Sequence, residues 1–544
     1  MPNDSVLSLF FFVTLFTCLL SANSHDDHIF LPSQLHDDDS VSCTATDPNL
    51  NYKPMIGILT HPGDGASGRL SNATGVSYIA ASYVKFVESG GARVIPLIYN
   101  ESPENLNKKL DLVNGVLFTG GWAVSGPYLD TLGNIFKKAL EKNDAGDHFP
   151  VIAFNLGGNL VIRIVSELGN PQTHLMLKKC EIISSTITNL LLVERLVIDF
   201  SNMSSDAVWV LFHLAFFSQC LPSAWAHSAI LLPGQLARDS PQSCPAPDPN
   251  LYYKPVIGIV SHPGDGASGR LSNATGASYI AASYVKFVEA AGARVVPLIY
   301  TEPPEKLLKK LELVNGVLFT GGWAKSGLYF ETVTKIFKKI LEKNDAGDHF
   351  PLFATCLGFE LITMIISQDN NILEEFSASN QASTLQFVEN ANIGESVFQR
   401  FPPELLGKMS TDCLVMQNHR YGISPGKLLN NPKLSSFFEI LTTCTDEDDK
   451  VYVSTVRSRN YPVTGFQWHP EKNAFEWGSP RIPHTEDAIQ ITQYVANFLV
   501  SEARKSLNRP VAQELLDNLI YNYSPTYCGK AGKGYDEVYI FAQA

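Results

Sequence analysis

The sequence predicts an α/β fold in which helices cover both faces of a mostly parallel sheet. The prediction rests on two observations from the region after residue 248. Short apolar runs rich in β-branched residues alternate there with helical patterns of about 10 to 15 residues. The runs contain few polar positions, which is typical of strands that are buried on both faces. In such sheets, ligands gather at the carboxyl ends of the strands.

The predicted elements follow in order along the chain. Strands are expected in VIGIV (256–260), RVVPLIY (294–300), GVLF (316–319), FPLFAT (350–355) and VTGFQWHP (463–470). Helices are expected over 279–289, 305–314 and 329–343, and the first of them is ended by Gly292. The strand ends at Gly321, Cys356 and His469 are therefore the places to look for chemistry.

Composition narrows the class of protein. The chain has 544 residues, of which 45% are hydrophobic and 17% charged, so it can bury a sizeable core. Its formal net charge of -13 gives no electrostatic footprint for nucleic acid or for an anionic membrane surface. Nine cysteines are too few for a disulfide framework in a chain of this length, and none has zinc spacing. We therefore predict no nucleic-acid partner, no membrane association of the mature form and no metal.

An internal repeat sets the expected domain organisation. The stretch that begins at Asp47 matches the stretch that begins at Asp248, an offset of 201 residues (248 minus 47), and the match ends after Gly157. A period this long indicates a duplicated domain rather than a solenoid. We expect a truncated copy over 44–160, an unrelated linker over 161–207, a complete domain over 248–528 and a tail over 529–544.

Two apolar segments resemble secretory signals. The first lies in 1–24, and the second, 208–226, ends in an A-x-A pattern in mid-chain, where signals do not belong. This order suggests two adjacent coding units joined end to end. The sequons at Asn72, Asn100 and Asn273 fit a secreted glycoprotein. The sequence leaves open whether Cys413, Cys444 and Cys528 are free or paired.

Cys356 is a candidate nucleophile. It stands between a buried-strand pattern and a helical pattern, with the small residues Ala354 two positions before it and Gly358 two positions after it. A tight strand-to-helix turn of this kind presents a side chain at the top of the sheet, beside a helix N-terminus that favours the thiolate. The alternative is a buried cysteine that acts as a small core residue.

His469 and Glu471 supply the partners that a nucleophilic thiol needs. Histidine can accept the thiol proton and return it to a leaving amine near neutral pH. Glu471, two residues further on and separated by Pro470, can orient one imidazole nitrogen and leave the other for sulfur. A strand-end histidine beside a surface glutamate is the alternative interpretation.

The stretches TCLGFE, FTGG, NHRYGIS and FQWHPEKNAFEW resemble those of the γ-glutamyl hydrolases, an omega peptidase family of the class I glutamine amidotransferase-like superfamily, over roughly 253–528. The resemblance implies a flavodoxin-like arrangement and a triad of Cys356, His469 and Glu471. It implies cleavage of folate poly-γ-glutamate tails through a thioester, in the vacuole or the extracellular space and cell wall of a plant. It also implies a homodimer and no cofactor.

Placing the substrate identifies further candidates. The backbone amides of Leu357 and Gly322 could hold the oxyanion, although paired glycines are usually only a tight turn. Glu360, one helical turn beyond the thiol, is either a contact for the charged α-substituents of the substrate or an exposed helix residue. The resemblance implies an auxiliary role for His419. Because polyglutamate is anionic, Arg270 and Arg420 are candidate cations, against the usual role of arginines as solvated surface residues.

The first copy lacks the residues that make the second copy a candidate enzyme. Asn155 stands where Cys356 stands in the second copy (356 minus 201), and an amide cannot be the nucleophile. The copy also ends before any equivalent of His419, His469 or Glu471, so we expect it to be inactive. We further expect fragment 44–159 to be poorly soluble, because it lacks the later strands. Two other functions remain open for the whole chain: a glutaminase-type amidotransferase domain, and a non-catalytic fused remnant.

Overall fold

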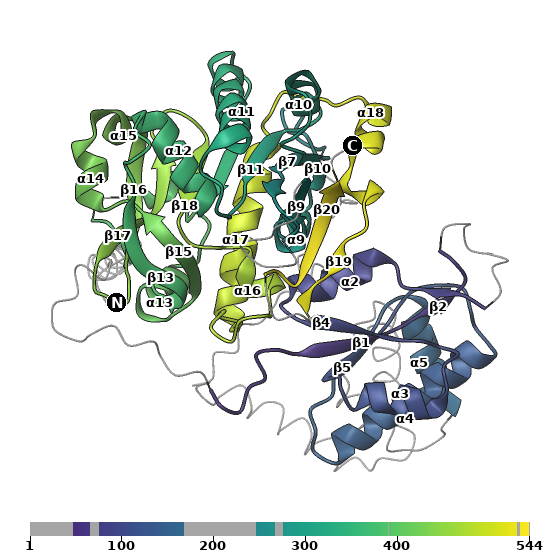
Figure 1. Ribbon diagram of the computed structural model, residues 1–544. Coiled ribbons are helices and arrows are strands. Elements are labelled where there is room, and N and C mark those ends of the chain that lie inside the picture. The colour runs from purple at the N-terminus through teal and green to yellow at the C-terminus, as the bar shows by residue number, and fades with distance from the viewer. Residues whose placement is uncertain are drawn as a thin grey trace, which may run out of the picture. The chain divides into compact units, whose positions relative to one another are not determined.

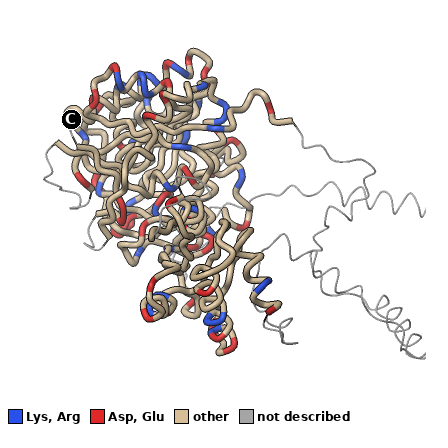
Figure 2. Tube along the Cα trace, turned by 90° about the vertical axis from the view of Figure 1, so that its right-hand side faces the viewer, with Lys and Arg blue, Asp and Glu red and all other residues tan. Residues whose placement is uncertain are grey.

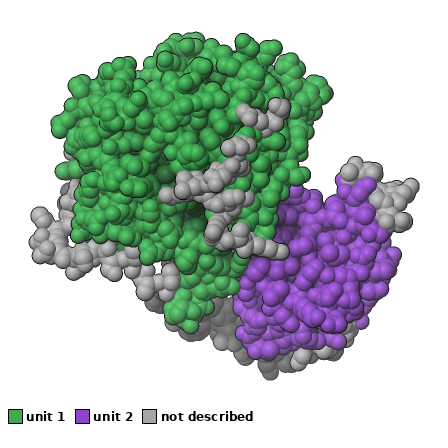
Figure 3. Space-filling view, viewed as in Figure 1, with its two compact units in different colours: residues 1–54, 85–93, 250–544 green, residues 55–84, 94–249 purple. Residues whose placement is uncertain are grey.

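The computed structural model describes residues 47–65, 75–167, 246–266, 276–389, 391–529 and 534–542. Figure 3 shows two compact units: Met1–Pro54, Lys85–Arg93 and Asn250–Ala544 form the first, and Met55–Val84 and Val94–Pro249 form the second. The predicted signal segments 1–24 and 208–226, Arg270, and the sequons at Asn72 and Asn273 lie outside the described residues.

An eight-stranded sheet forms the centre of the first unit (Figure 1). Its order is β10 (Arg294–Leu298), β7 (Val256–Val260), β11 (Gly316–Phe319), β12 (Leu352–Thr355), β18 (Val463–Phe466), β17 (Val451–Ser458), β16 (Phe438–Thr445) and β14 (Gln386–Phe387). The first five strands are parallel and the last three extend the sheet in antiparallel fashion. Numbered along the chain, the five parallel strands have the order 2-1-3-4-5, which is the flavodoxin-like arrangement. The predicted α/β fold with a mostly parallel sheet is confirmed.

Side chains alternate between two cores on the two faces of this sheet. Along β7, Ile257 and Ile259 enter one core, while Val256 and Val260 enter the other. The first core is covered by α9 (Ala282–Ala290) and α17 (Glu486–Ala503), and the second by α10 (Pro304–Leu311), α11 (Gly327–Asp345) and α12 (Leu357–Ser367). Burial on both faces explains why the strands read as continuous apolar runs.

Two predictions are wrong, one about where a helix begins and one about where this domain ends. The expected helix over 279–289 begins as a strand, β9 (Ala277–Ala281), and becomes helical only at Ala282. The expected tail 529–544 contains β20 (Glu537–Ala542), which pairs antiparallel with β9 from Val538 opposite Ala281 to Ala542 opposite Ala277. With β8 (His262–Pro263) and β19 (Thr526–Tyr527) they form a second, four-stranded sheet, so the domain extends beyond residue 528.

The remaining elements of the first unit connect these layers. They are β13 (Glu374–Ser383), η4 (Ile393–Glu395), α13 (Pro403–Thr411), β15 (Val415–Gly422), α14 (Pro425–Asn430), α15 (Pro432–Phe437), α16 (Lys472–Phe475), α18 (Ala512–Asn518) and η5 (Ile520–Asn522). Strands β13 and β15 form an antiparallel pair of their own. β15 and the loop after β18 contribute to the site described below.

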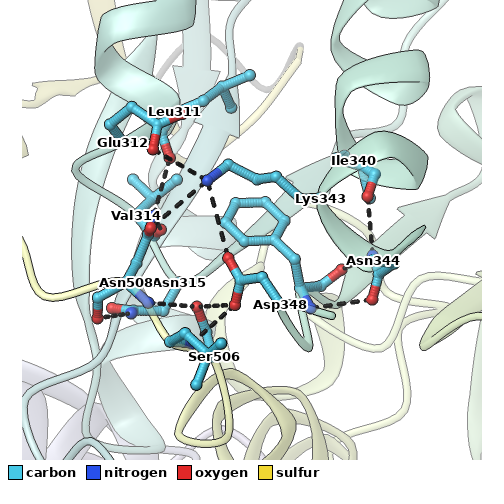
Figure 4. Close-up of polar contacts among 12 residues, drawn as sticks. Leu311, Glu312, Val314, Asn315, Ile340, Lys343, Asn344, Asp348, Ser506 and Asn508 are labelled. Atoms are coloured by element: carbon cyan, nitrogen blue, oxygen red, sulfur yellow. Dashed lines mark hydrogen bonds and ion pairs between the residues drawn. The ribbon is translucent and has the colours of Figure 1, made fainter. Parts of the chain in front are cut away.

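A polar network ties three segments together just before β11 begins (Figure 4). The Asn508 amide, in the chain that follows α17, donates to the carbonyl oxygens of Val314 at 2.6 Å and Leu311 at 3.2 Å. The Lys343 ammonium, near the end of α11, lies 3.1 Å from the Glu312 carboxylate. These bonds fix the amino end of β11, and therefore the direction in which its carboxyl end points.

The first copy of the repeat forms a shorter version of the same architecture. Its sheet has the order β4 (Arg93–Leu97), β1 (Met55–Leu59), β5 (Gly115–Phe118) and β6 (Val151–Ala153), with β2 (His61–Pro62) paired to β3 (Ser77–Tyr78) alongside. Its helices are α2 (Ala81–Ser89), α3 (Pro103–Leu110), α4 (Pro127–Asp144) and α5 (Leu156–Glu167). The predicted end at residue 160 is too early, because α5 continues to Glu167 and buries Val161 and Val165 against the core of this copy.

Charged residues of both signs are interspersed along the chain rather than gathered by sign, as Figure 2 shows. Over the described residues, no helix combines the length and the apolar character that a membrane crossing requires.

Candidate active site

Cys356 occupies the turn between β12 and α12. Its backbone has φ +50°, a conformation that non-glycine residues rarely adopt, and its amide donates to the Phe466 carbonyl oxygen on neighbouring β18 at 2.6 Å. A Cβ at Gly358 would lie 2.7 Å from the Phe319 carbonyl oxygen, so the first turn of α12 packs against β11 only because this residue is glycine. Cys356 itself exposes only 4% of its surface.

His469 and Glu471 lie together where the chain leaves β18. The imidazole Nδ1 is 2.7 Å from the Glu471 carboxylate, and both side chains are buried. An ionised carboxylate can only accept, so Nδ1 is the donor of this bond, and in the neutral ring Nε2 then carries the lone pair. This is the tautomer that a general base requires.

Tyr284 on α9 holds the strand end of β11 against this histidine. Its hydroxyl accepts a hydrogen bond from the Gly321 amide at 2.8 Å and lies 3.4 Å from His469 Nδ1. Burial raises the pKa of Tyr284 well above its usual value, so the hydroxyl stays neutral. A Cβ at Gly321 would come within 2.7 Å of the His469 ring and 3.5 Å of the Cys356 Cβ, so Gly321 lies close to both residues.

A cavity of about 170 Å³ opens over these groups. It is lined by Gly266, Tyr279, Gly322, Trp323, Cys356, Asn418, His469, Lys472, Gly534 and Tyr535. Cys356, His469 and Gly322 come from three neighbouring parallel strands, β12, β18 and β11, at their carboxyl ends, and share this cavity. The second sheet supplies Tyr279, and the connection between β19 and β20 supplies Gly534 and Tyr535.

The two predicted oxyanion donors, Gly322 and Leu357, differ in their placement. Gly322 lines the cavity, and Leu357 is the first residue of α12, directly after the thiol. Within the residues that the structure describes, neither amide donates to a protein acceptor. Of the two, Gly322 lines the cavity and Leu357 does not, so their oxyanion role stays a prediction.

His262 on β8 shapes the loop that carries Gly322, and sequence reasoning missed it. Its Nε2 accepts from the amides of Trp323 at 3.0 Å and Ala324 at 3.2 Å, while Nδ1 lies 2.8 Å from the Pro263 carbonyl oxygen. Burial lowers the pKa of His262 to about 4, so the ring is neutral at ordinary pH and Nε2 can accept. A Cβ at Gly322 would lie 2.3 Å from this ring, so the loop requires glycine there.

The structure does not bring the predicted substrate-binding residues together in the cavity. Glu360 is buried rather than exposed: its carboxylate pairs with the Lys325 ammonium at 2.8 Å and lies outside the set that lines the cavity. His419 on β15 is buried, and its Nδ1 lies 2.9 Å from the Tyr421 carbonyl oxygen. Arg420, the next residue on the same strand, is exposed and pairs with Glu375 at 3.1 Å, away from the cavity. Neighbours on a strand point to opposite faces, so His419 and Arg420 cannot both face one site.

Glu476 and Asp536 hold the segment that closes the cavity. The Glu476 carboxylate accepts from the Asp536 amide at 2.9 Å, and the Asp536 carboxylate accepts from the Trp477 amide. Burial, together with the negative charge of Asp536, raises the pKa of Glu476 to about 8. These bonds fix the approach of β20 and with it Tyr535.

The structure assigns a redox state to the three cysteines that the sequence left open. Cys444 and Cys528 carry reduced thiols, whereas Cys413 is disulfide-bonded.

In the first copy, Asn155 adopts the same left-handed conformation as Cys356, with φ +46°, and His61 accepts from Trp122 and Ala123 as His262 does from their counterparts. The first copy therefore retains the scaffold of the turn without its thiol.

A thiol at the carboxyl edge of a parallel sheet, with an imidazole in the same cavity and a carboxylate behind it, defines the class of cysteine-type hydrolases. The family model for peptidase C26 matches residues 54–137 and 255–471. The chain belongs to the peptidase C26 family. The two matched segments begin 201 residues apart (255 minus 54), which is the offset of the internal repeat.

Curated relatives agree with this family. The chain is 68% identical over 339 residues to γ-glutamyl hydrolase 2 of Arabidopsis thaliana, covering 62% of this chain and 97% of that one. It is 49% identical over 542 residues to γ-glutamyl hydrolase of Glycine max, covering 99% and 100%, and 39% identical over 295 residues to the mouse γ-glutamyl hydrolase, covering 53% and 90%. A solved glutamine amidotransferase from Thermotoga maritima aligns with a TM-score of 0.23 at 14% identity, over 40% of this chain and 77% of that one.

Proposed function

We propose that this chain hydrolyses γ-glutamyl isopeptide bonds in folylpoly-γ-glutamates and releases glutamate or short γ-glutamyl peptides. The observation that carries the proposal is the single cavity lined by Cys356 and His469, with Glu471 bound to the far side of the imidazole at 2.7 Å. Curated relatives that bear the name γ-glutamyl hydrolase support the substrate class.

In this proposal the roles of the residues are as follows. His469 Nε2 accepts the Cys356 proton, and the thiolate attacks the γ-carbonyl carbon of the scissile bond. The amides of Gly322 and Leu357 stabilise the oxyanion, a contribution worth about 2.7 to 4 kcal/mol for one donor in comparable enzymes. When the C–N bond breaks, imidazolium returns its proton to the departing amine. His469 then activates a water that hydrolyses the thioester, which releases the acyl product and restores the thiol.

Replacement of the nucleophile tests the proposal. The full chain is incubated with pteroylpentaglutamate, and the products are resolved by chromatography. We expect Cys356→Ser to lower kcat/KM by at least 10³-fold, because serine at this position lacks the acidity of a thiol. Cys444→Ser, which changes a buried thiol outside the cavity, is the matched control and should retain activity. An active Cys356→Ser chain would refute the mechanism.

The same preparation separates the two rival functions. A glutaminase-type domain would release ammonia from free glutamine and leave the pteroyl substrate intact. A non-catalytic remnant would turn over neither substrate in the full chain but could bind pteroylpolyglutamate, which equilibrium dialysis detects. The reduced thiol and the base within one cavity favour an enzyme over a non-catalytic remnant, and the relatives named γ-glutamyl hydrolase favour this substrate over free glutamine.

We also propose that the chain enters the secretory pathway and acts in the vacuole or the extracellular space, that it is glycosylated, and that it forms a homodimer. The signal-like segment 1–24 and the sequons at Asn72, Asn100 and Asn273 support secretion and glycosylation, and the family resemblance supports the dimer. A mass shift on deglycosylation, organelle fractionation and analytical ultracentrifugation test the three statements. An unglycosylated cytosolic monomer would overturn all of them.

The truncated copy is proposed to be a non-catalytic duplicate. Asn155 at the position of the thiol supports this, as does the offset that the two copies share. Asn155→Cys should therefore not add activity to a Cys356→Ser chain, since no counterpart of His469 or Glu471 exists in that copy. A tryptic map of the native protein would determine whether both copies occur in one polypeptide.

A further inference from the structure

The loop between β11 and α11, which carries Gly322, is held at three points. Near its start, the Tyr284 hydroxyl accepts from a backbone amide at 2.8 Å, and in its middle the His262 imidazole accepts from two more at 3.0 and 3.2 Å. At its far end, the Lys325 ammonium lies 2.8 Å from the Glu360 carboxylate. This third contact joins the loop to the helix that follows the candidate nucleophile, since Glu360 lies in the first turn of α12.

The Lys325–Glu360 pair differs from an ordinary surface ion pair. The Glu360 side chain exposes 5% of its surface and the Lys325 side chain 25%. An exposed pair contributes little to stability, whereas a buried carboxylate that loses its cation is left as an uncompensated charge. The Lys325 ammonium also lies 3.5 Å from the centroid of the Tyr421 ring on β15, which is a cation–π contact. The position of the ammonium is therefore fixed by two different elements.

Glu360 connects this ion pair to the other segments of the site. Its second carboxylate oxygen accepts from the side-chain amide of Gln467 at 3.4 Å, two residues before His469 in the chain that follows β18. Its backbone amide donates to the Cys356 carbonyl oxygen at 3.0 Å. One residue thus contacts the turn of the thiol, the segment of the base and, through Lys325, the loop after β11.

The truncated copy keeps the first two contacts of this loop and not the third. The stretch VNGVLFTGGWA is identical in both copies, and in the truncated copy Tyr83 and His61 still accept from the loop amides. Val124 and Asn159, however, stand where the ion pair stands in the complete copy (325 and 360, each minus 201). The copy that has lost the thiol has therefore also lost both members of the pair.

We propose that Lys325 is a positioning residue of the active site. Its ion pair with Glu360 holds the loop so that the Gly322 amide faces the carbonyl carbon under attack. The proposal rests on the proposed function, in which this amide stabilises the oxyanion. Lys325 lies outside the set of residues that line the cavity, so it acts through the loop rather than on the substrate. A displacement of about 1 Å in such a group can cost on the order of 10²-fold in rate.

Steady-state kinetics of the full chain on pteroylpentaglutamate provide the first test. Lys325→Met should lower kcat about 10- to 100-fold and leave KM within about twofold, because an oxyanion donor acts in the transition state. Lys325→Arg keeps the charge and the contact with the aromatic ring, and should recover most of the lost kcat. Lys335→Met, which removes an exposed lysine from α11, is the matched control and should behave as the wild type does. A loss that appears in KM alone, or that arginine does not recover, would overturn the proposal.

A double-mutant cycle tests whether Lys325 acts through Glu360. Glu360→Gln removes the charge but keeps the shape of the side chain and an oxygen that can accept from Gln467. If the two side chains act as one unit, each single variant and the double variant should lose about the same factor in kcat. Losses that multiply in the double variant would show independent roles and would refute the proposed route.

Two reagents that contain no γ-glutamyl bond separate this proposal from the proposed function. The Cys356 thiolate attacks the carbonyl carbon of p-nitrophenyl acetate through an oxyanion and expels p-nitrophenolate, whereas it displaces iodide from iodoacetamide without one. Both rates are measured by mass spectrometry of the peptide that contains Cys356.

The ratio of the acetylation rate to the alkylation rate should fall about 10-fold in Lys325→Met and be kept in Lys325→Arg. An unchanged ratio would overturn the proposal even if the wild type is active, and so would equal losses in both rates, because they would indicate damage to the thiol itself. A lowered ratio in a chain that cleaves no γ-glutamyl bond would leave the positioning role standing and refute the proposed substrate.

Discussion

Replacement of Glu471 by glutamine probes the orientation of the catalytic base. The Glu471 carboxylate lies 2.7 Å from His469 Nδ1, and its side chain is fully buried. With an effective dielectric constant of about 20, a unit charge pair at this separation is worth roughly 6 kcal/mol. A glutamine keeps the shape but removes the charge that stabilises imidazolium, and its amide can also donate, which favours the wrong tautomer. We expect kcat/KM to fall about 10³- to 10⁴-fold.

The assay follows hydrolysis of pteroylpentaglutamate together with the pH dependence of iodoacetamide alkylation at Cys356. If Glu471 supports the thiolate–imidazolium pair, the alkylation profile of Glu471→Gln should move to higher pH. Glu439→Gln is the control, since the Glu439 carboxylate pairs with Arg457 at 2.7 Å outside the cavity. A folded Glu471→Gln chain that keeps more than a tenth of its activity, with an unshifted profile, would contradict the assigned role.

Three further predictions follow from contacts of buried groups. His262→Phe removes the acceptor of two loop amides, so kcat should fall about 10- to 100-fold with KM nearly constant, while the matched His61→Phe should leave steady-state kinetics unchanged. His262 and His484 have pKa values lowered to about 4 by burial, so the free energy of unfolding should decline as pH falls from 6.5 to 4, by roughly 3 kcal/mol for each histidine; a flat melting temperature over this range would contradict the calculation. Fragment 44–159 should be poorly soluble, since it has no counterpart of α17, and a soluble fragment that melts cooperatively would refute this expectation.

The sequence predicted those strands whose burial can be recognised from their own residues. Five apolar runs became the five parallel strands, because a strand buried on both faces needs apolar residues at every position. β9 was missed because ASYIA runs directly into ASYVKF, and the junction between strand and helix has no turn residue to mark it. β20 was missed for a different reason: its only described sheet partners are β9 and β19, and β9 lies far away in sequence.

The same distinction applies to the site. Cys356, His469 and Glu471 could be proposed because each follows a strand or stands two residues from its partner. His262 could not, since its role consists of accepting hydrogen bonds from amides 61 and 62 residues away. Period-2 alternation was a usable signal that Arg420 and His419 face opposite sides of β15.

The left-handed turn at Cys356 also limits which inactive variants can be used to trap a substrate. A β-branched replacement would be strained at φ +50°, and would disturb the cavity that it was meant to preserve. Asn155 occupies the equivalent turn of the first copy at φ +46°, so asparagine is a residue that this scaffold already accommodates there. Cys356→Asn is consequently the substitution of choice for crystals of an uncleaved complex.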